Sequence, residues 1–300
     1  MNNFFQQRSL ILEPLIGESG ETCLFGVSVK PRRAHLHVGE LSVEWLRALV
    51  RSEQLVVLRG FDSFDDAGSM SRYCSTFGEI MMWPFGAVLE LIEHLNPRDH
   101  IFASSYVPLH WDGMYLETVP EFQMFHCVHA PGETEGGRTT FSSTTEALRI
   151  ATPEAQALWG RARGRYGRTV ELYSNTVDAP ILERHPRREF PVLRFCEPPI
   201  ENDSTFINPS IHVFGGIGEN EQKELLRSLR HVLYDHRVHY AHRWQAGDVV
   251  LADNFTLLHG RERFVSQANR HLRRVHIHGE PPLFNPHLLS GAPDVAQRHA

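Results

Sequence analysis

Residues 106–115 read Tyr-Val-Pro-Leu-His-Trp-Asp-Gly-Met-Tyr, and the chemistry of the whole chain is best interpreted around this stretch. Its apolar beginning predicts a strand that carries His110 and Asp112, two residues apart. Alternate side chains of an extended strand point to the same side. The imidazole and the carboxylate can therefore bind one small cation together.

His259, far along the chain, is the candidate third ligand. It follows a turn at Gly247, a strand-like apolar run and a polar break at Asp253 and Asn254. This order predicts a rigid position at a strand end. Two histidines and one carboxylate form the facial ligand set of non-haem Fe(II) oxygenases, in which positions remain open for substrates.

Each part of this pattern is weak alone. The chain has 19 His, so about one His-x-Asp is expected by chance, and His278-Gly279-Glu280 is a competing site. Taken alone, His259 is better explained as a structural core histidine whose ring hydrogen-bonds to the backbone. Zinc is an alternative occupant, because raw affinity favours it over Fe(II).

The amino-acid composition limits the classes of protein to which this chain can belong. The 300 residues contain 41% hydrophobic and 22% charged residues, with a net charge of −6, which is typical of a globular domain. The absence of a basic block argues against nucleic acid or an anionic membrane as partner. Four scattered cysteines without a Cys-x-x-Cys pair predict reduced thiols. We expect a soluble, cytoplasmic protein, because the sequence shows neither a signal peptide nor a membrane span.

The order of elements predicts one domain, residues 1–300, that is α+β but mainly β. Helical periodicity covers residues 41–53, and a second helix, capped by Asp62 or Ser63, is expected up to Phe77. Beyond residue 81, short runs separated by Gly, Pro and Asn predict a barrel or sandwich core. Helices are expected at 143–149, 153–163 and 219–234, and residues 284–300 are expected to be a loosely held tail.

A basic run follows the candidate third ligand. On a strand, Arg270 and Arg274 would share one face, roughly 13 Å apart at about 3.3 Å per residue. A planar guanidinium binds a carboxylate bidentately, so this spacing suits two small carboxylates. A solvated basic face is the alternative.

With these residues assembled, the chain resembles the taurine/2,4-dichlorophenoxyacetate dioxygenase family of Fe(II)/2-oxoglutarate enzymes. The resemblance rests on His110-x-Asp112, His259, the Gly136-Gly137-Arg138-Thr139 turn, and arginines eleven and fifteen residues after His259. It implies a double-stranded β-helix (jelly-roll) core flanked by helices. It also implies that His110, Asp112 and His259 bind Fe(II), with 2-oxoglutarate and O2 as co-substrates. Arg274 and Thr139 would hold the distal carboxylate of 2-oxoglutarate, and Arg270 would face the primary substrate.

Several long strings, among them residues 77–90, 106–125 and 183–199, are similar to the branch of this family that acts in isonitrile biosynthesis. This similarity implies a small-molecule substrate, 2-isocyano-3-(4-hydroxyphenyl)propanoate, and its desaturation with or without loss of CO2. Tyr106 and Trp111 are expected to contribute an apolar wall around its ring. A hydroxylase of another small carboxylate and a non-catalytic metal-binding or carboxylate-binding β-barrel are the alternatives.

Overall fold

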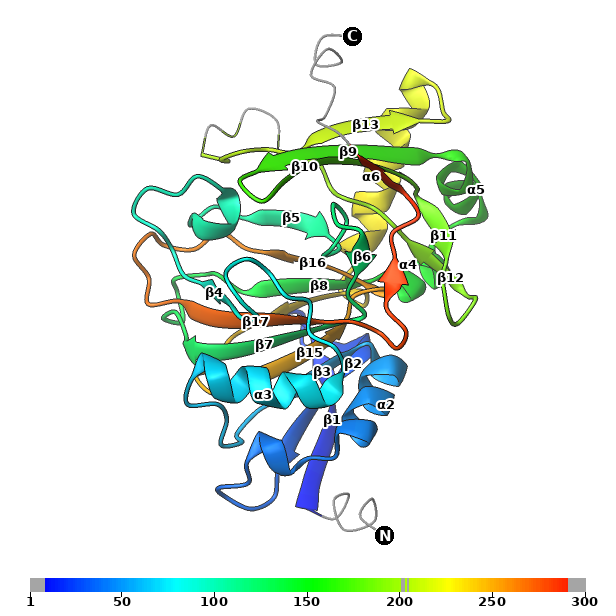
Figure 1. Ribbon diagram of the computed structural model, residues 1–300. Helices are drawn as coiled ribbons and strands as arrows, with labels where there is room; N and C mark the ends of the chain where they lie inside the picture. Colours follow the sequence, from blue (N-terminus) through cyan, green and yellow to red (C-terminus); the bar gives the residue numbers. More distant parts are fainter. Residues whose placement is uncertain (1–8, 201–202, 204, 291–300) are drawn as a thin grey trace.

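The computed structural model describes residues 9–200, 203 and 205–290 (Figure 1). Its largest sheet has the strand order β1-β2-β3-β15-β7-β17-β4. These strands are Leu10–Ile16, Thr22–Pro31, Leu55–Leu58, Val249–Asp253, Phe122–His129, His271–Ile277 and Leu89–Leu91. A second sheet has the order β14-β8-β16-β5, with bounds His239–His242, Thr139–Ser143, Leu257–Arg261 and Val107–His110. The site lies where these two sheets meet.

Alternation along the central strands explains why the two sheets pack together. Phe125, Val250 and Leu272 of the large sheet are buried in one cluster with Phe141 and Leu257 of the second sheet. The neighbouring residues point to the other face, where α2 (Val43–Glu53) and α3 (Ala67–Phe77) cover them. Strands buried on both faces read as continuous apolar runs, as residues 249–252 do.

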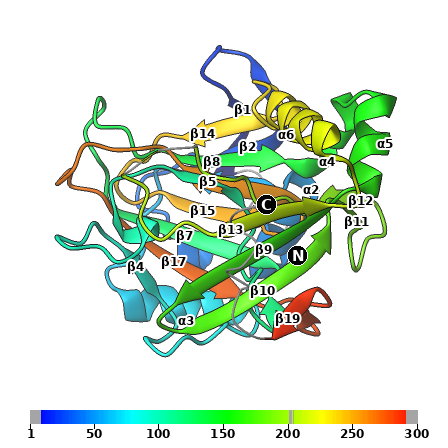
Figure 2. The same ribbon diagram turned by 90° about the horizontal axis from the view of Figure 1, so that it is seen from above.

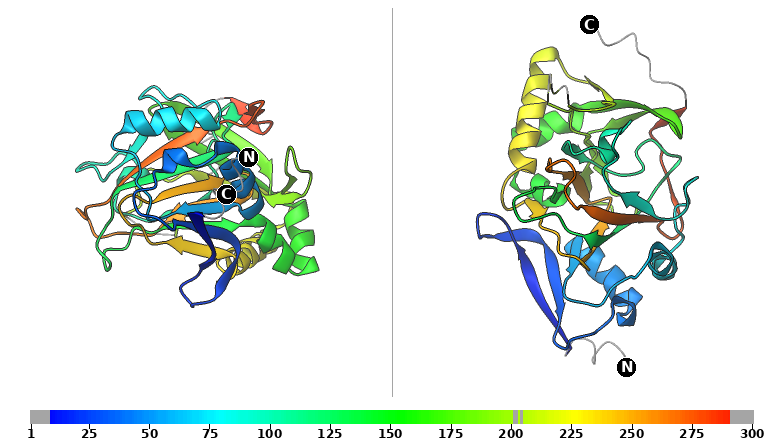
Figure 3. Two further views of the ribbon diagram at one scale, coloured as in Figure 1. Left: turned by 90° about the horizontal axis from the view of Figure 1, so that it is seen from below. Right: turned by 90° about the vertical axis from the view of Figure 1, so that its left-hand side faces the viewer.

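A third sheet, in the order β13-β9-β10-β19, lies at the end of the molecule opposite β1 and β2 (Figures 1, 2 and 3). Its strands are Ile211–Gly215, Arg163–Val170, Tyr173–Pro180 and Leu288–Ser290. Its apolar side chains join a buried cluster with α4 (Thr144–Ile150), α5 (Pro153–Arg161) and α6 (Glu219–Leu233). The remaining short elements are η1 (Val38–Glu40), η2 (His100–Phe102), β6 (Thr118–Val119), β11 (Leu182–Arg184), β12 (Pro191–Leu193) and β18 (Leu283–Phe284).

Most predicted helices are confirmed, but the beginning of the second one is not. Its N-cap is Asp66, whose carboxylate accepts the Ser69 N–H at 2.6 Å. The Asp66 N–H in turn bonds the Ser69 hydroxyl, which completes a capping box. Asp62 is unavailable as a cap because its backbone bonds Leu36 and Val38 in extended geometry.

Residues 284–290 are not a loose tail. Phe284 ends β18, which pairs with β6, and β19 adds to the edge of β10. Residues 291–300 of the predicted tail lie outside the described part of the chain, and the single-domain assignment stays a prediction. No helix in the described residues is long and apolar enough to cross a membrane.

Candidate active site

His110 and His259 come from neighbouring strands of the second sheet and are direct Cα partners in the β5–β16 pair. Their ring centroids lie 4.3 Å apart. His110 Nδ1 lies 2.8 Å from the Pro108 carbonyl, a contact that fixes the proton on Nδ1. Nε2 of His110 is therefore left as a ligand atom.

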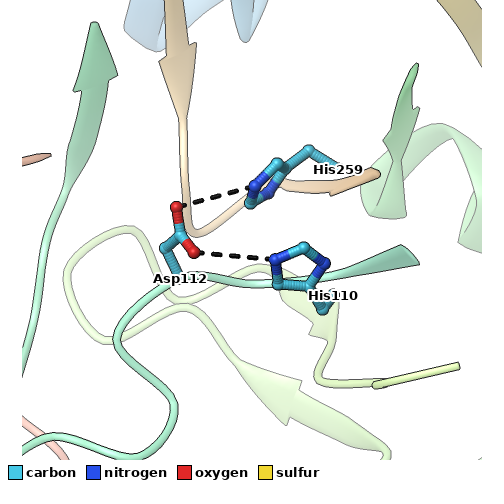
Figure 4. Close-up of side chains that lie close together, drawn as sticks. All are labelled: His110, Asp112 and His259. Carbon is cyan, nitrogen blue, oxygen red and sulfur yellow. Dashed lines mark ion pairs between the residues drawn. The ribbon is translucent and has the colours of Figure 1, made fainter. Parts of the chain in front are cut away.

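Asp112 reaches the same point although β5 ends at His110. Its carboxylate oxygens lie 3.6 Å from His110 Nε2 and 3.5 Å from His259 Nε2 (Figure 4). The prediction that the two ligands share a continuous strand is therefore wrong, but they do converge. Asn254 supplies the reason: its amide bonds the backbone N–H and the carbonyl of Asp112, both at 2.9 Å.

Three side chains of the large sheet hold one oxygen of Asp112. Gln123 Nε2 lies 2.6 Å from Oδ2, His276 Nε2 lies 2.7 Å from it, and Arg274 Nη1 lies 2.8 Å from it. Gln123 and His276 are Cα partners on β7 and β17. Because Oδ2 is occupied by donors, Oδ1 is the oxygen left to ligate a metal.

The charges in the site keep the ligands in metal-binding form. Burial would raise the pKa of Asp112, but the charge of Arg274 opposes it, and this pKa lies well below its ordinary value. Burial holds the pKa of His259 well below its ordinary value. An ionised carboxylate faces a neutral imidazole, as metal coordination requires.

The donor set fits a divalent first-row metal. One ligand atom each from His110, Asp112 and His259 all lie within 4.8 Å of one another. Among the described residues, this is the one group of three such donors close enough to hold a metal. Glu280 of the competing pattern instead pairs with Arg47 at 3.3 Å.

A cavity of about 1450 Å³ opens beside the ligands. His110, Asp112, Trp111, Arg274 and His276 all line it, and the third sheet contributes to its opposite wall. This volume accommodates a small aromatic acid together with water. Trp111 is buried and lines this cavity, and its role as a wall around the substrate ring stays a prediction.

The two arginines lie in different places than the sequence predicts. Arg274, expected to hold 2-oxoglutarate, faces the large cavity and contacts Asp112. Arg270, expected to face the substrate, is absent from that cavity wall. It is buried, and its Nε donates to the Gly137 carbonyl at 2.9 Å. Arg270 precedes β17, which begins at His271, so it lies outside the strand whose alternation the shared-face prediction depended on.

Thr139 and Tyr106 occupy supporting positions. Thr139 is buried in β8 two residues after Gly137, and its hydroxyl accepts the Trp244 indole N–H at 3.1 Å. Tyr106 does not line the cavity: its hydroxyl accepts the Ile200 N–H, and its ring packs on Phe206. The expectation that Tyr106 forms a substrate wall is therefore wrong.

The sequence reasoning missed Gln123 and Asn254 as residues that hold the ligands. Nothing in their local sequence marks them, because each contacts Asp112 through the tertiary fold. The alternation that places His276 on the Arg274 face was a usable signal for the third such residue.

Comparisons with known proteins agree with this geometry. Residues 25–276 match the family described as "Taurine catabolism dioxygenase TauD, TfdA family", and the chain belongs to this family. It is an oxygenase that uses Fe(II) and 2-oxoglutarate, as the sequence predicts.

Two curated relatives cover nearly the whole chain. A tyrosine isonitrile desaturase of Erwinia amylovora is 67% identical, over 94% of this chain and 96% of that protein. A tyrosine isonitrile desaturase of Pseudomonas aeruginosa is 59% identical, over 96% and 99%.

Solved structures confirm the jelly-roll fold. PvcB, described as an Fe, alpha-ketoglutarate dependent oxygenase from an isonitrile synthetic pathway, is 56% identical, with a TM-score of 0.83 over 96% of this chain and 99% of that one. A taurine dioxygenase-like protein of Burkholderia xenovorans shares only 17% identity but has a TM-score of 0.68 over 95% and 100%, and so supports the fold alone.

Proposed function

We propose that the protein is a tyrosine isonitrile desaturase. It acts on 2-isocyano-3-(4-hydroxyphenyl)propanoate and uses Fe(II), 2-oxoglutarate and O2. The observation that carries this proposal is 67% identity over nearly the full length to a tyrosine isonitrile desaturase, in a chain where two of the three metal ligands, His110 and Asp112, line a cavity of suitable size.

Bound Fe(II), with 2-oxoglutarate and O2, supplies the two-electron oxidant. One 2-oxoglutarate and one O2 give succinate, CO2 and water, while the substrate loses two hydrogens, or one hydrogen and its carboxyl group as CO2. His110, His259 and Asp112 hold the metal. The donors on Asp112 Oδ2 fix the direction of its free oxygen.

Arg270 is the better candidate for the distal carboxylate of 2-oxoglutarate, in place of Arg274. Burial lowers the pKa of Arg270 to about 10, and no carboxylate pairs with it among the described residues. A buried cation without an anion is costly, so an anionic ligand would stabilise it. Thr139, two residues beyond the Gly137 that Arg270 contacts, is proposed to bond the same carboxylate.

Arg274 is proposed to receive the carboxylate of the isocyano substrate, because it faces the cavity beside the metal ligands. A substrate anchored there presents its side-chain carbons to the metal, while Trp111 excludes water from one side. Water exclusion strengthens every charge interaction inside the site.

The test is reconstitution of the purified protein with Fe(II), 2-oxoglutarate and the isonitrile under air. We expect succinate to form in step with substrate loss. We also expect a product two hydrogens lighter by mass spectrometry, or lighter by the elements of formic acid if CO2 departs. Hydroxylation of free tyrosine with no reaction of the isonitrile would overturn the proposal.

A further inference from the structure

The cavity holds a second buried pair of Arg and carboxylate, remote in sequence from the metal ligands. Arg168 of β9 donates from Nη2 to both oxygens of Asp99, at 2.7 and 2.6 Å. Each side chain is only 12% exposed, and both line the cavity. A buried ion pair is costly unless its remaining donors and acceptors are satisfied, so its partners decide what it can bind.

The carboxylate of this pair is fully engaged, but the guanidinium is not. Asp99 also accepts the Ile101 N–H at 3.1 Å and the Asn208 amide at 3.2 Å. Arg168 Nη1 has one partner in the described chain, the His100 ring nitrogen at 3.3 Å. Nη1 carries two hydrogens, so one N–H remains for a ligand.

The loop that carries Asp99 and His100 is held rigidly. Arg261 donates to the backbone carbonyls of residues 100, 101, 103 and 105 at 2.6–2.9 Å. His100 Nδ1 lies 3.1 Å from the Ile207 carbonyl. Burial and the Arg168 charge lower the pKa of His100 to about 3, so it adds no competing positive charge.

Two tyrosines line the same cavity as this pair and the metal ligands. Tyr173 stacks on Tyr115, with ring centroids 5.8 Å apart, and both line the cavity. Burial raises the pKa of Tyr173 to about 12, and the charges of both the Arg168–Asp99 and the Arg274–Asp112 pairs act on it. Tyr173 therefore lies close enough to both pairs to feel their charges.

We propose that Arg168, oriented by Asp99, donates a hydrogen bond to the 4-hydroxyl oxygen of the substrate and so selects hydroxyphenyl over phenyl substrates. This inference rests on the proposed function. A substrate with its carboxylate at Arg274 and its ring against Tyr173 directs its hydroxyl toward the second pair. A site built to bond a hydroxyl rejects the analogue that lacks it, because the buried donor is then left unpaired.

The test compares kcat/KM for tyrosine isonitrile and for its phenylalanine counterpart, 2-isocyano-3-phenylpropanoate. The main variant is Asp99→Asn with Arg168→Met, which removes both charges and leaves no unpaired buried ion. We expect a loss of about 10- to 100-fold on the tyrosine substrate, mainly through KM. The phenylalanine substrate should change by less than about threefold. Arg168→Lys, which keeps the charge, should restore part of the preference.

Asp248→Asn with Arg59→Met is the matched control, since it likewise removes both charges of a pair. Arg59 contacts Asp248 at 2.6 Å, the carboxylate of this pair is buried and its guanidinium is 27% exposed, and neither residue lines the cavity. It should affect both substrates equally. Equal losses on both substrates in the Asp99/Arg168 variant would mean that this pair serves only the fold, and would overturn the proposal.

A binding measurement separates this proposal from the proposed function. Calorimetry with 3-(4-hydroxyphenyl)propanoate and 3-phenylpropanoate, on protein loaded with Mn(II) and 2-oxoglutarate, requires no turnover. The hydroxylated acid should bind more tightly to the wild type, and the difference should vanish in the double variant. A wild type that converts neither isonitrile would contradict the proposed function. Equal binding of the two acids would contradict the role of Arg168.

Discussion

His259 and His110 face each other as Cα partners across two antiparallel strands, although 149 residues (259 − 110) separate them in the chain. The strand pairing sets the spacing of the two imidazoles, and Asp112 completes the set from the turn beyond β5. The metal site is thus a consequence of sheet register, which a one-residue slip would destroy.

Replacement of any ligand should abolish turnover. For His110→Ala, Asp112→Ala and His259→Ala we expect no succinate above background. Substitution of a residue that only hydrogen-bonds to a metal ligand lowers metal affinity by roughly 10- to 100-fold. Replacement of a ligand itself should lower it further. Anaerobic titration with Fe(II) and 2-oxoglutarate, followed through the visible charge-transfer band, measures this, and circular dichroism checks folding. Full activity in any folded variant would remove the metal assignment.

Gln123→Met should lower activity without removing the metal ligands. Methionine keeps similar volume but cannot donate to Asp112 Oδ2, so the carboxylate is less firmly oriented. We expect kcat to fall about tenfold or more with little change in melting temperature. Gln54→Met is the control, because Gln54 bonds Thr145 and Ser143 and has no contact with the ligands. An equal effect of the two substitutions would argue against a role in orientation.

Substitutions of Arg270 and Arg274 should change different steady-state kinetic constants. Arg270→Met should raise the KM for 2-oxoglutarate at least about tenfold, since one charge-assisted pair is lost. Arg274→Met should raise the KM for the isonitrile, and it should also lower kcat because Arg274 contacts Asp112. Initial rates with each substrate varied in turn distinguish the two. The opposite pattern would restore the assignment that the sequence favours.

The free energy of unfolding should fall at acidic pH, because histidines that are buried and neutral in the folded protein take up protons when the chain unfolds. One such histidine, His239, is not part of the metal site. Burial lowers the pKa of His239 to about 4, against an ordinary value of 6.5. Between these pH values the unfolded chain binds the extra proton and the folded one does not, so stability declines as pH falls. The contribution of His239 is up to about 3 kcal/mol between pH 6.5 and 4.

His239→Asn tests this by keeping a donor for the Ser142 hydroxyl, which lies 2.9 Å from His239 Nδ1. Urea unfolding at pH 7 and pH 5 should show a smaller loss of stability in the variant than in the wild type. An identical loss in both proteins would place the acid sensitivity at other groups.

The sequence by itself determined the class of core, most helices and the three metal ligands. Short apolar runs and cap residues act locally, so α4 and α5 begin within one residue of their predicted starts, with Ser143 and Thr152 as their N-caps. The ligands were found because the residue types suited to Fe(II) are few and their spacing matches a known family.

Only the tertiary structure decided which residues serve those ligands and where each arginine acts. No apolar run marks β9, in which Gly and Arg interrupt the apolar residues, or β10, whose residues are mostly polar, and the stability of both comes from pairing with each other and of β9 with β13. Arg270 lies just before β17 begins and contacts Gly137, whereas Arg274 within β17 faces the cavity. Gln123, Asn254 and Arg168 act across the fold, and contacts between distant segments leave no periodic trace in one chain.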